Sequence, residues 1–404
     1  MKRFAIIMIV CLAVPAFSAS VLRQARDAIK KNQKLDETAK TLIAEATKEG
    51  TKHADRVECW RLAAECSRKL QAEENKKMYL KQKADTARFF TLILDNYSRT
   101  LTADSLSRLP DEKGRIKALS PRRVHDVLAP QRNNLLTGGK WFYRQGKNVE
   151  AFRCFDTYVN CLDIEAFAPD SLATKDTLLA EAAYLAVATA YASNNGEGVL
   201  RHSELAQKAG QKSYLIQEYT CRTLAARGDT AATLRALKLG MERYPDHPYF
   251  FSNLVDADIA AGAMSEALEL VDSMLAKDNT NALRWYARSL VLLRLGRDRE
   301  AIDACDSCLH YQADHIDALY NKGIASLNLA VIYAETACTD INDPRCLRDR
   351  EIIRSLYNLA KVPMERVRQL TPEDTTRWAA PLYRIYLNLN MGPQFDEIDK
   401  MMKN

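Results

Sequence analysis

Three glycines near the middle of the chain recur at a spacing of 34 residues: Gly228, Gly262 and Gly296. Ala267 and Ala301 each follow their glycine by five residues, so the repeat extends beyond the glycines themselves. A fixed period of this length is typical of repeat arrays, in which each unit buries its apolar face against the next. The 404 residues contain only 14 Gly and 12 Pro, too few turn residues for a strand-rich fold of this size. The sequence therefore predicts pairs of helices joined by glycine turns.

The rest of the pattern recurs around the third glycine and again before the first. The segment 282–315 repeats the arrangement, with Trp285 near its start, and the segment 132–165 carries an earlier copy. The earlier copy has small, aromatic or turn residues at the expected places, namely Gly139, Phe142, Gly146, Ala151, Phe155 and Tyr158. This alternation of large, small and turn residues resembles the tetratricopeptide repeat (TPR) family of exported, Gram-negative envelope type. The resemblance implies an all-α fold, a right-handed superhelical solenoid of about eight TPR-like helix pairs.

Outside the clear repeats the pattern weakens, and four regions are expected. Residues 1–19 form a signal peptide, and residues 20–131 form an N-terminal helical segment with degenerate repeats and a loop near 109–121. Residues 132–330 hold the TPR-like repeats, and residues 331–404 hold degenerate repeats, a loop at 338–346 and a C-terminal capping helix. In the N-terminal segment, Trp60 and its neighbours predict a first helix, followed by a second, longer helix from about Asn75.

The N-terminus has the features of a secretory signal peptide. Met1-Lys2-Arg3 precedes an apolar run from Phe4 to Val14, and small residues follow, so cleavage after residue 16, 18 or 19 is possible. The apolar run is about eleven residues long, whereas a helix needs roughly 20 to cross a bilayer. We therefore expect an exported protein with no transmembrane segment after signal cleavage. The style of the signal and the resemblance to envelope repeat proteins favour the periplasm of a Gram-negative envelope.

Charge is distributed unevenly along the chain. Residues 21–150 contain 28 Lys and Arg against 17 Asp and Glu, whereas residues 151–404 contain 28 against 35. The basic residues are mixed with acidic ones instead of being concentrated beside stacking aromatics, so nucleic acid is not an expected partner. A protein or peptide partner is expected, and the oligomeric state stays open.

Nine cysteines remain after removal of a signal peptide. Cys338 and Cys346 bracket a loop that contains a proline and form the one candidate disulfide, with two free thiols as the alternative. Cys305 and Cys308, with histidines nearby, resemble a zinc-ligand set. The repeat register places both cysteines at packing positions, so we predict no metal site.

Catalytic motifs are absent from the sequence, including G-x-S-x-G, H-E-x-x-H and the phosphate-binding loop G-x-x-x-x-G-K-[ST]. No catalytic residue, cofactor or enzymatic activity is predicted. A scaffold that binds a protein or peptide on its concave face is the expected function. The alternatives are an accessory subunit of an outer-membrane assembly or transport complex, and an envelope hydrolase with carboxylates gathered in its groove.

The resemblance also implies which residues face the partner, because the first helix of each TPR pair lines the concave wall. Transferred to this chain, the inward positions are Lys140, Tyr143, Arg144, Glu218, Arg222, Tyr249, Asp256, Tyr286, Arg294, Tyr320 and Asn328. Aromatic and Arg side chains are common anchors at interfaces. The Lys and Asn clamp of chaperone-type members is missing from these positions, so binding of chaperone tails is not expected.

Overall fold

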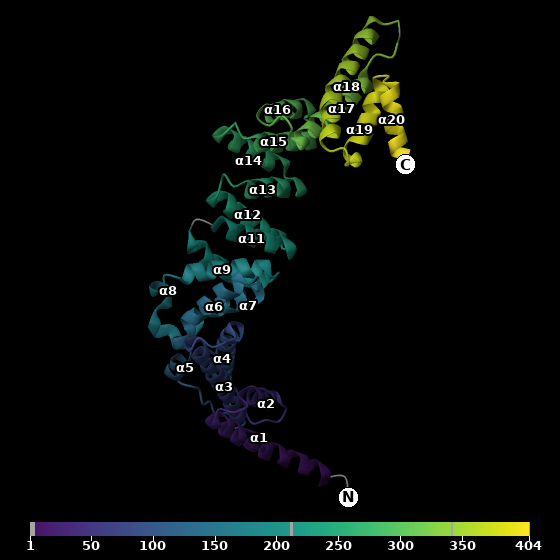
Figure 1. The fold of residues 1–404 in the computed structure, drawn as a ribbon. Coiled ribbons are helices and arrows are strands. Elements are labelled where there is room, and N and C mark those ends of the chain that lie inside the picture. Colours follow the sequence, from purple (N-terminus) through teal and green to yellow (C-terminus); the bar gives the residue numbers. More distant parts are fainter. Residues whose placement is uncertain (1–4, 211–212, 341, 404) are drawn as a thin grey trace. The chain divides into compact units, whose positions relative to one another are not determined.

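The computed structural model describes residues 5–210, 213–340 and 342–403, with side chains from Ser18 onward. These ranges contain helices and no strand, and consecutive helices follow one another in chain order (Figure 1). The chain divides into two compact units, Met1–Ala236 and Leu237–Asn404. The predicted fold class, an all-α arrangement of TPR-like helix pairs, is confirmed.

The predicted signal peptide falls largely outside the described side chains. Met1-Lys2-Arg3 and Phe4 are not described, and α1 (Ala5–Lys31) is described as backbone only up to residue 17. Across the described part of the chain, no helix combines the length and the apolar character that crossing a membrane requires.

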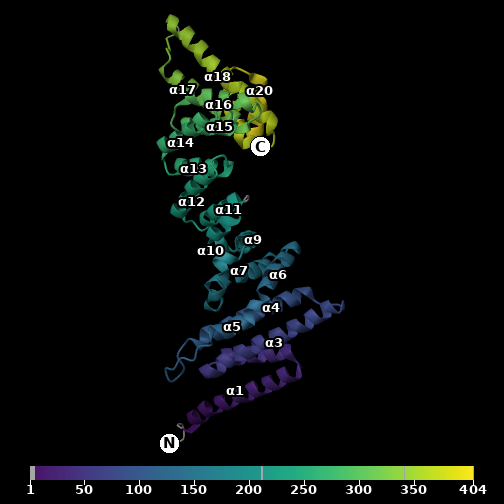
Figure 2. The same cartoon turned by 90° about the vertical axis from the view of Figure 1, so that its left-hand side faces the viewer.

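The first unit contains α1 and eleven further helices, the last of which crosses into the second unit. They are α2 (Leu35–Thr47), α3 (His53–Tyr79), α4 (Thr86–Ser107), α5 (Pro121–Leu128), α6 (Arg132–Arg144), α7 (Asn148–Asn160), α8 (Leu172–Lys175), α9 (Leu179–Ala192), α10 (Gly196–Ala206), α11 (Ser213–Ala226) and α12 (Thr230–Arg243). Short 3₁₀ turns at Ala129–Gln131, Cys161–Asp163, Glu165–Asp170 and Gln207–Ala209 connect some of them. Figure 2 shows α1, α3 and α4 as the long helices of this unit.

The N-terminal helices pack through their apolar stripes. Leu22, Ala25 and Ile29 of α1 are buried in one core with Leu42 of α2. The prediction of a separate helix from Asn75 is wrong, because α3 continues through that residue to Tyr79. The segment 61–79 contains no Gly or Pro to interrupt a helix. The chain reverses afterwards, where Lys81 adopts a left-handed φ of 55°.

The repeats at the end of the first unit have the predicted close helix crossings. A Cβ atom at Gly139 of α6 would lie 2.5 Å from Phe155 of α7, so only glycine fits this contact. Ala151, Phe155 and Tyr158 are buried in the same core, and Gly146 makes the turn between the helices with a φ of 70°. Gly228 makes the equivalent turn between α11 and α12 with a φ of 73°.

The second unit begins within α12 and continues through four helix pairs. Its remaining helices are α13 (Pro248–Ala260), α14 (Met264–Lys277), α15 (Ala282–Arg294), α16 (Asp298–Tyr311), α17 (Ile316–Thr336), α18 (Pro344–Leu370), α19 (Thr375–Asn388) and α20 (Gly392–Lys403). Gly262 and Gly296 make the first two turns with φ values of 74° and 69°, and Ala267 and Ala301 are fully buried five residues later. The 34-residue spacing therefore marks turns and helix crossings, as expected.

The last two pairs of the second unit are longer or less regular. Ala330 stands where earlier pairs have a turn glycine, so α17 continues to Thr336 and the loop follows later. Pro363 lies inside α18, and Trp378 of α19 is buried in the C-terminal core beside Ile398 of α20. The described ranges contain nine helix pairs, in agreement with the expected number of about eight.

Candidate interaction surfaces on the first helices

Four tyrosines from three first helices come together in the first unit, and we call them the tyrosine surface. They are Tyr143 of α6, Tyr184 and Tyr191 of α9, and Tyr219 of α11. Tyr184 and Tyr191 are seven residues apart, which places them on one face of α9. The Tyr191 and Tyr219 rings stack with centroids 4.1 Å apart, and Tyr143 is 49% exposed. This part of the molecule offers flat aromatic area to a partner.

The hydroxyls of the tyrosine surface influence one another. Burial raises the pKa of Tyr184, and the nearby hydroxyls of Tyr219 and Tyr143 raise it further. Burial also raises the pKa of Tyr219, with an added contribution from Glu218. Tyr184 and Tyr219 therefore stay neutral hydrogen-bonding groups at ordinary pH.

Three of the four predicted charged residues beside the tyrosine surface, Lys140, Glu218 and Arg222, are already paired. The Lys140 ammonium lies 2.7 Å from a carboxylate oxygen of Glu181, and Arg222 lies 2.8 Å from Glu218. Arg144 is exposed at the end of α6. Exposed ion pairs contribute little to stability, so these pairs mainly set the local charge pattern.

Five side chains from four first helices make a second surface in the second unit, which we call the acidic surface. They are Asp256 of α13, Tyr286 of α15, Asp317 and Tyr320 of α17, and Arg377 of α19. Arg377 forms an ion pair with Asp317, and its guanidinium lies 5.2 Å from the centre of the Tyr320 ring. Arg377 is therefore held between a carboxylate and an aromatic face.

The other end of the acidic surface lacks such compensation. Burial raises the pKa of Tyr286, and the charges of Asp317 and Asp256 raise it further. Burial likewise raises the pKa of Asp256, and no hydrogen bond or ion pair to its side chain occurs among the residues described. The Tyr286 ring packs against His315, with centroids 4.9 Å apart. The result is a carboxylate without a counter-ion beside an aromatic side chain.

The remaining predicted contact residues have differing surroundings. Arg294 is exposed at the end of α15, and Tyr249 packs edge-on against Phe250 at 5.4 Å. The Asn328 side chain donates a hydrogen bond of 2.9 Å to the buried carboxylate of Asp298. Asn328 therefore has an internal role, whatever it does for a partner.

Sequence reasoning missed several members of these surfaces as contact residues. The seven-residue spacing of Tyr184 and Tyr191 is a readable signal for a shared helix face. Tyr219 was missed because the copied positions selected its neighbour Glu218. Arg377 had no signal, because α19 lies outside the clear 34-residue copies.

The nine cysteines with described side chains are all free thiols, and all of them except Cys338 are buried. Burial raises the pKa of the Cys305 thiol to about 12 and that of Cys308 to about 11, and both side chains are fully buried. Within the described ranges no group of three His, Cys, Asp or Glu residues is placed to hold a metal ion. Cys346 is buried, Cys338 is half-buried, and both are free thiols, so their disulfide stays a prediction.

Two carboxylates on α13 have a raised pKa, which is the property that the hydrolase alternative requires. Burial raises the pKa of both Asp256 and Asp258. Residues two apart on a helix do not face each other. Asp256 and Asp258 therefore do not form the facing pair that acid–base hydrolysis uses.

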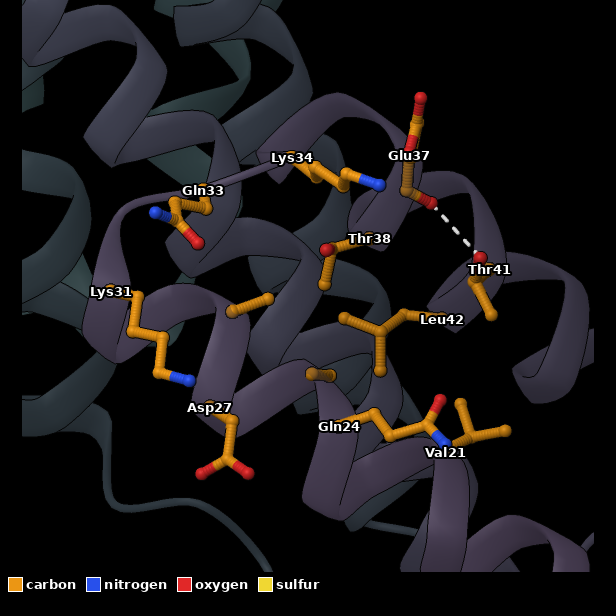
Figure 3. Close-up of a pocket in the computed structure, with 12 residues that line it drawn as sticks. Val21, Gln24, Asp27, Lys31, Gln33, Lys34, Glu37, Thr38, Thr41 and Leu42 are labelled. Carbon is orange, nitrogen blue, oxygen red and sulfur yellow. Dashed lines mark hydrogen bonds between the residues drawn. The ribbon is translucent and has the colours of Figure 1, made fainter.

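A pocket of about 320 Å³ lies between α1 and α2 in the first unit. Figure 3 shows Leu42 and Val21 beside the polar side chains of Gln24 and Thr38, with Lys31 and Lys34 farther along the pocket. The Thr41 hydroxyl donates to the carbonyl of Glu37 within α2, so its proton is already used and only its oxygen can accept from a ligand. Sequence reasoning did not identify this pocket.

Comparison with known proteins finds no matching family model and no matching curated protein. Among solved structures, the chain is similar to YrrB, a TPR protein with an unusual peptide-binding site (15% identity, TM-score 0.36, 50% of this chain and 98% of that one). It is also similar to the C-terminal part of a TPR protein from Cytophaga hutchinsonii (10%, 0.37, 62% and 93%). A third similar structure is pilF of Pseudomonas aeruginosa (12%, 0.35, 61% and 94%).

At these scores the fold assignment depends on the chain's own geometry. Three turn glycines with left-handed φ recur at 34 residues, and a buried alanine follows two of them by five residues. By this helix-pair geometry, the chain is an all-helical protein of tetratricopeptide-like repeats.

Proposed function

We propose that this protein is a non-catalytic scaffold that binds a protein or peptide partner along its first helices, with the acidic surface as the main contact. The partner would present a Lys or Arg side chain to Asp256 and an apolar or aromatic side chain to Tyr286. The observation that carries the proposal is the unpaired carboxylate of Asp256 beside Tyr286.

The chemistry of Asp256 favours a cationic partner group. Asp256 is an exposed side chain whose pKa burial nevertheless raises, so a new counter-ion would stabilise its charged form. The second unit also carries 20 Lys and Arg against 25 Asp and Glu, so its net charge attracts a basic segment.

Tyr286 supplies the apolar part of the contact. Its ring is half-buried and packs against His315, so its rotamer is already restricted. Little side-chain freedom is therefore lost when a partner packs on it. Tyrosine anchors of this kind commonly dominate the energy of an interface.

We further propose that the protein is exported and acts in the periplasm of a Gram-negative envelope. The supporting observation is the basic, apolar and small-residue order at the N-terminus. In that compartment, the same binding activity would suit an accessory subunit of an outer-membrane assembly or transport complex.

Site-specific photo-crosslinking in cells tests the proposal. A photoreactive phenylalanine at Tyr286 should yield a discrete adduct with a partner, because this position touches the bound segment. The same amino acid at Tyr311, which is 46% exposed on the second helix α16, serves as the matched control and should yield none. Adducts of equal yield at both positions would contradict the proposal.

A charge reversal on the same background tests the role of Asp256. Asp256→Lys should abolish the Tyr286 adduct, because a cation would then meet the partner's cation. Asp303→Lys makes the same charge change on an exposed position of α16 and should leave the adduct intact. Loss of the adduct in both variants would indicate a general charge effect instead of a site.

A further inference from the structure

A cavity of about 180 Å³ lies between α3, α4 and α5 in the first unit. Three arginines line it: Arg61 and Arg68 of α3, and Arg123 of α5. Arg61 and Arg68 are seven residues apart, so they lie on one face of α3. No acidic side chain lines the cavity, whose other lining residues are apolar apart from one threonine.

The three guanidiniums differ in how they are compensated. Arg61 makes hydrogen bonds of 2.7 and 2.9 Å to Glu58 and lies 3.8 Å from Glu65. Arg68 has no ion pair among the described residues, and its Nε is buried without a hydrogen-bond partner. The backbone N–H of the exposed Arg123 donates to Ser120, and no hydrogen bond or ion pair of its guanidinium occurs among the described residues. Two guanidiniums therefore border the cavity without a carboxylate of their own.

A buried donor without a partner is uncommon and calls for an explanation, such as an anion that binds there. Burial lowers the pKa of Arg68, with the charge of Arg61 adding to the effect and Glu65 opposing it. Burial thus disfavours the Arg68 cation in the free protein, and an entering anion would offset that cost. A guanidinium also matches the two oxygens of a carboxylate in a planar, bidentate arrangement.

The apolar lining determines what must accompany the anion. Ala103 and Val124 are buried at the cavity, and Val127 is half-buried beside them. A cavity of about 150 Å³ lined by aliphatic side chains takes up benzene. A space of this size and lining therefore suits a compact hydrocarbon group.

We propose that this cavity binds a small organic carboxylate, with the anionic head at Arg68 and Arg123 and an apolar body of about benzene size against Val124 and Val127. The site uses helices other than those of the tyrosine and acidic surfaces, so it is independent of the proposed scaffold function. Benzoate is a suitable probe, and benzamide is its neutral isostere.

Calorimetric titration of the full chain tests the charge requirement. Benzoate should bind saturably. Benzamide should bind at least about tenfold more weakly than benzoate, because the charged hydrogen bonds are lost. Arg123→Gln should weaken benzoate binding by a similar factor, whereas Arg122→Gln, the exposed neighbour on α5, should not. Equal binding of benzoate and benzamide, or equal effects of the two Arg variants, would overturn the proposal.

A second measurement locates the ligand without relying on a variant. Methyl NMR of the unmodified protein should show saturable benzoate shifts at Val124 and Val127, and sulfate should compete poorly because it lacks the apolar body. Absence of these shifts, or competition by sulfate at equal concentration, would overturn the assignment. If the Arg68→Gln variant folds, it should also bind benzoate more weakly. If it does not fold, the Arg123→Gln variant still tests the proposal.

Discussion

The two compact units are both built from helix pairs. They differ in net charge and in whether the charged side chains on their first helices have a counter-ion. The first unit contains 38 Lys and Arg against 27 Asp and Glu, and the second contains 20 against 25. Beside the tyrosine surface of the first unit, Lys140 and Arg222 are paired with carboxylates. On the acidic surface of the second, Asp256 is not.

This difference shows that helix packing and surface chemistry are set by separate residues. The turn glycines and crossing alanines follow one rule in both units, because any close helix crossing needs small side chains. The outward positions of the first helices are free of that requirement, so each unit can present a different surface to a partner.

The largest expected effect concerns whether the two units unfold separately. Trp378 of α19 is 2% exposed and donates a hydrogen bond of 2.9 Å to Thr371. Trp378→Ala should cost about 3–5 kcal/mol, because it leaves a large cavity in the core of the second unit. Hydrogen exchange should show lost protection in residues 237–404 and unchanged protection in residues 20–210.

Phe155→Ala provides the reciprocal variant, because Phe155 is fully buried in the first unit. It should reduce protection in the first unit only. Equal loss in both units from either variant would mean that the chain unfolds as one body.

The second effect concerns a buried ion pair of the first unit. Arg132 lies 2.7 Å from Asp176, both side chains are about nine-tenths buried, and the Tyr158 hydroxyl donates to the same carboxylate at 2.8 Å. Asp176→Asn should destabilise the first unit by about 3 kcal/mol at neutral pH, because it leaves the Arg132 charge unpaired. Urea unfolding followed by hydrogen exchange in this unit measures the change.

The same residue predicts a pH dependence. Burial alone would raise the pKa of Asp176, but the hydrogen bonds from Tyr158 and Arg132 outweigh it and lower the pKa. The stabilisation is therefore present above the unfolded-state pKa of about 3.9 and is lost as the pH falls through the lower folded-state value. The unmodified first unit should lose stability below about pH 4, and Asp176→Asn should reduce that loss. An acid limb of the same size in both proteins would contradict the assignment.

The third effect tests the turn glycines that both units share. Gly262 has a φ of 74°, and a Cβ atom added there would have no other atom within 4 Å, so only backbone conformation opposes a substitution. Gly262→Ala should destabilise the second unit by about 1 kcal/mol, and Gly146→Ala should do the same to the first. Gly392→Ala is the control, because that glycine has open space and no left-handed φ. Thermal unfolding should show no destabilisation of the control, because alanine fits the helical backbone at that position.

The smallest expected effect has the opposite sign. Burial raises the pKa of Asp256, so its ionised form is disfavoured in the folded state and costs stability once the pH exceeds the unfolded-state value. Asp256→Asn should therefore stabilise the second unit at neutral pH, by no more than about 0.5 kcal/mol because the side chain is exposed. The gain should vanish in acid, where both states are protonated. Destabilisation at neutral pH would show that Asp256 has a structural partner.

Sequence reasoning succeeded where a structural feature depends on residues close together in the chain. The turns at Gly262 and Gly296 and the loop before α18 were predicted from the local positions of glycine and proline. It failed at α3, because residues 61–79 carry no local signal to mark whether a helix ends or continues.

The amino-acid sequence by itself determined the helix pairs, the positions of their turns and the small residues at their crossings, because each of these is decided by side chains within one hairpin. Only the tertiary structure decided that Arg377 joins Asp317, that Asn328 holds Asp298, and that Arg68 borders a cavity without a counter-ion. The first two contacts each join helices of different pairs, and the cavity lies between α3, α4 and α5. Their pairing depends on how neighbouring elements are rotated and offset when they pack, which no local spacing encodes.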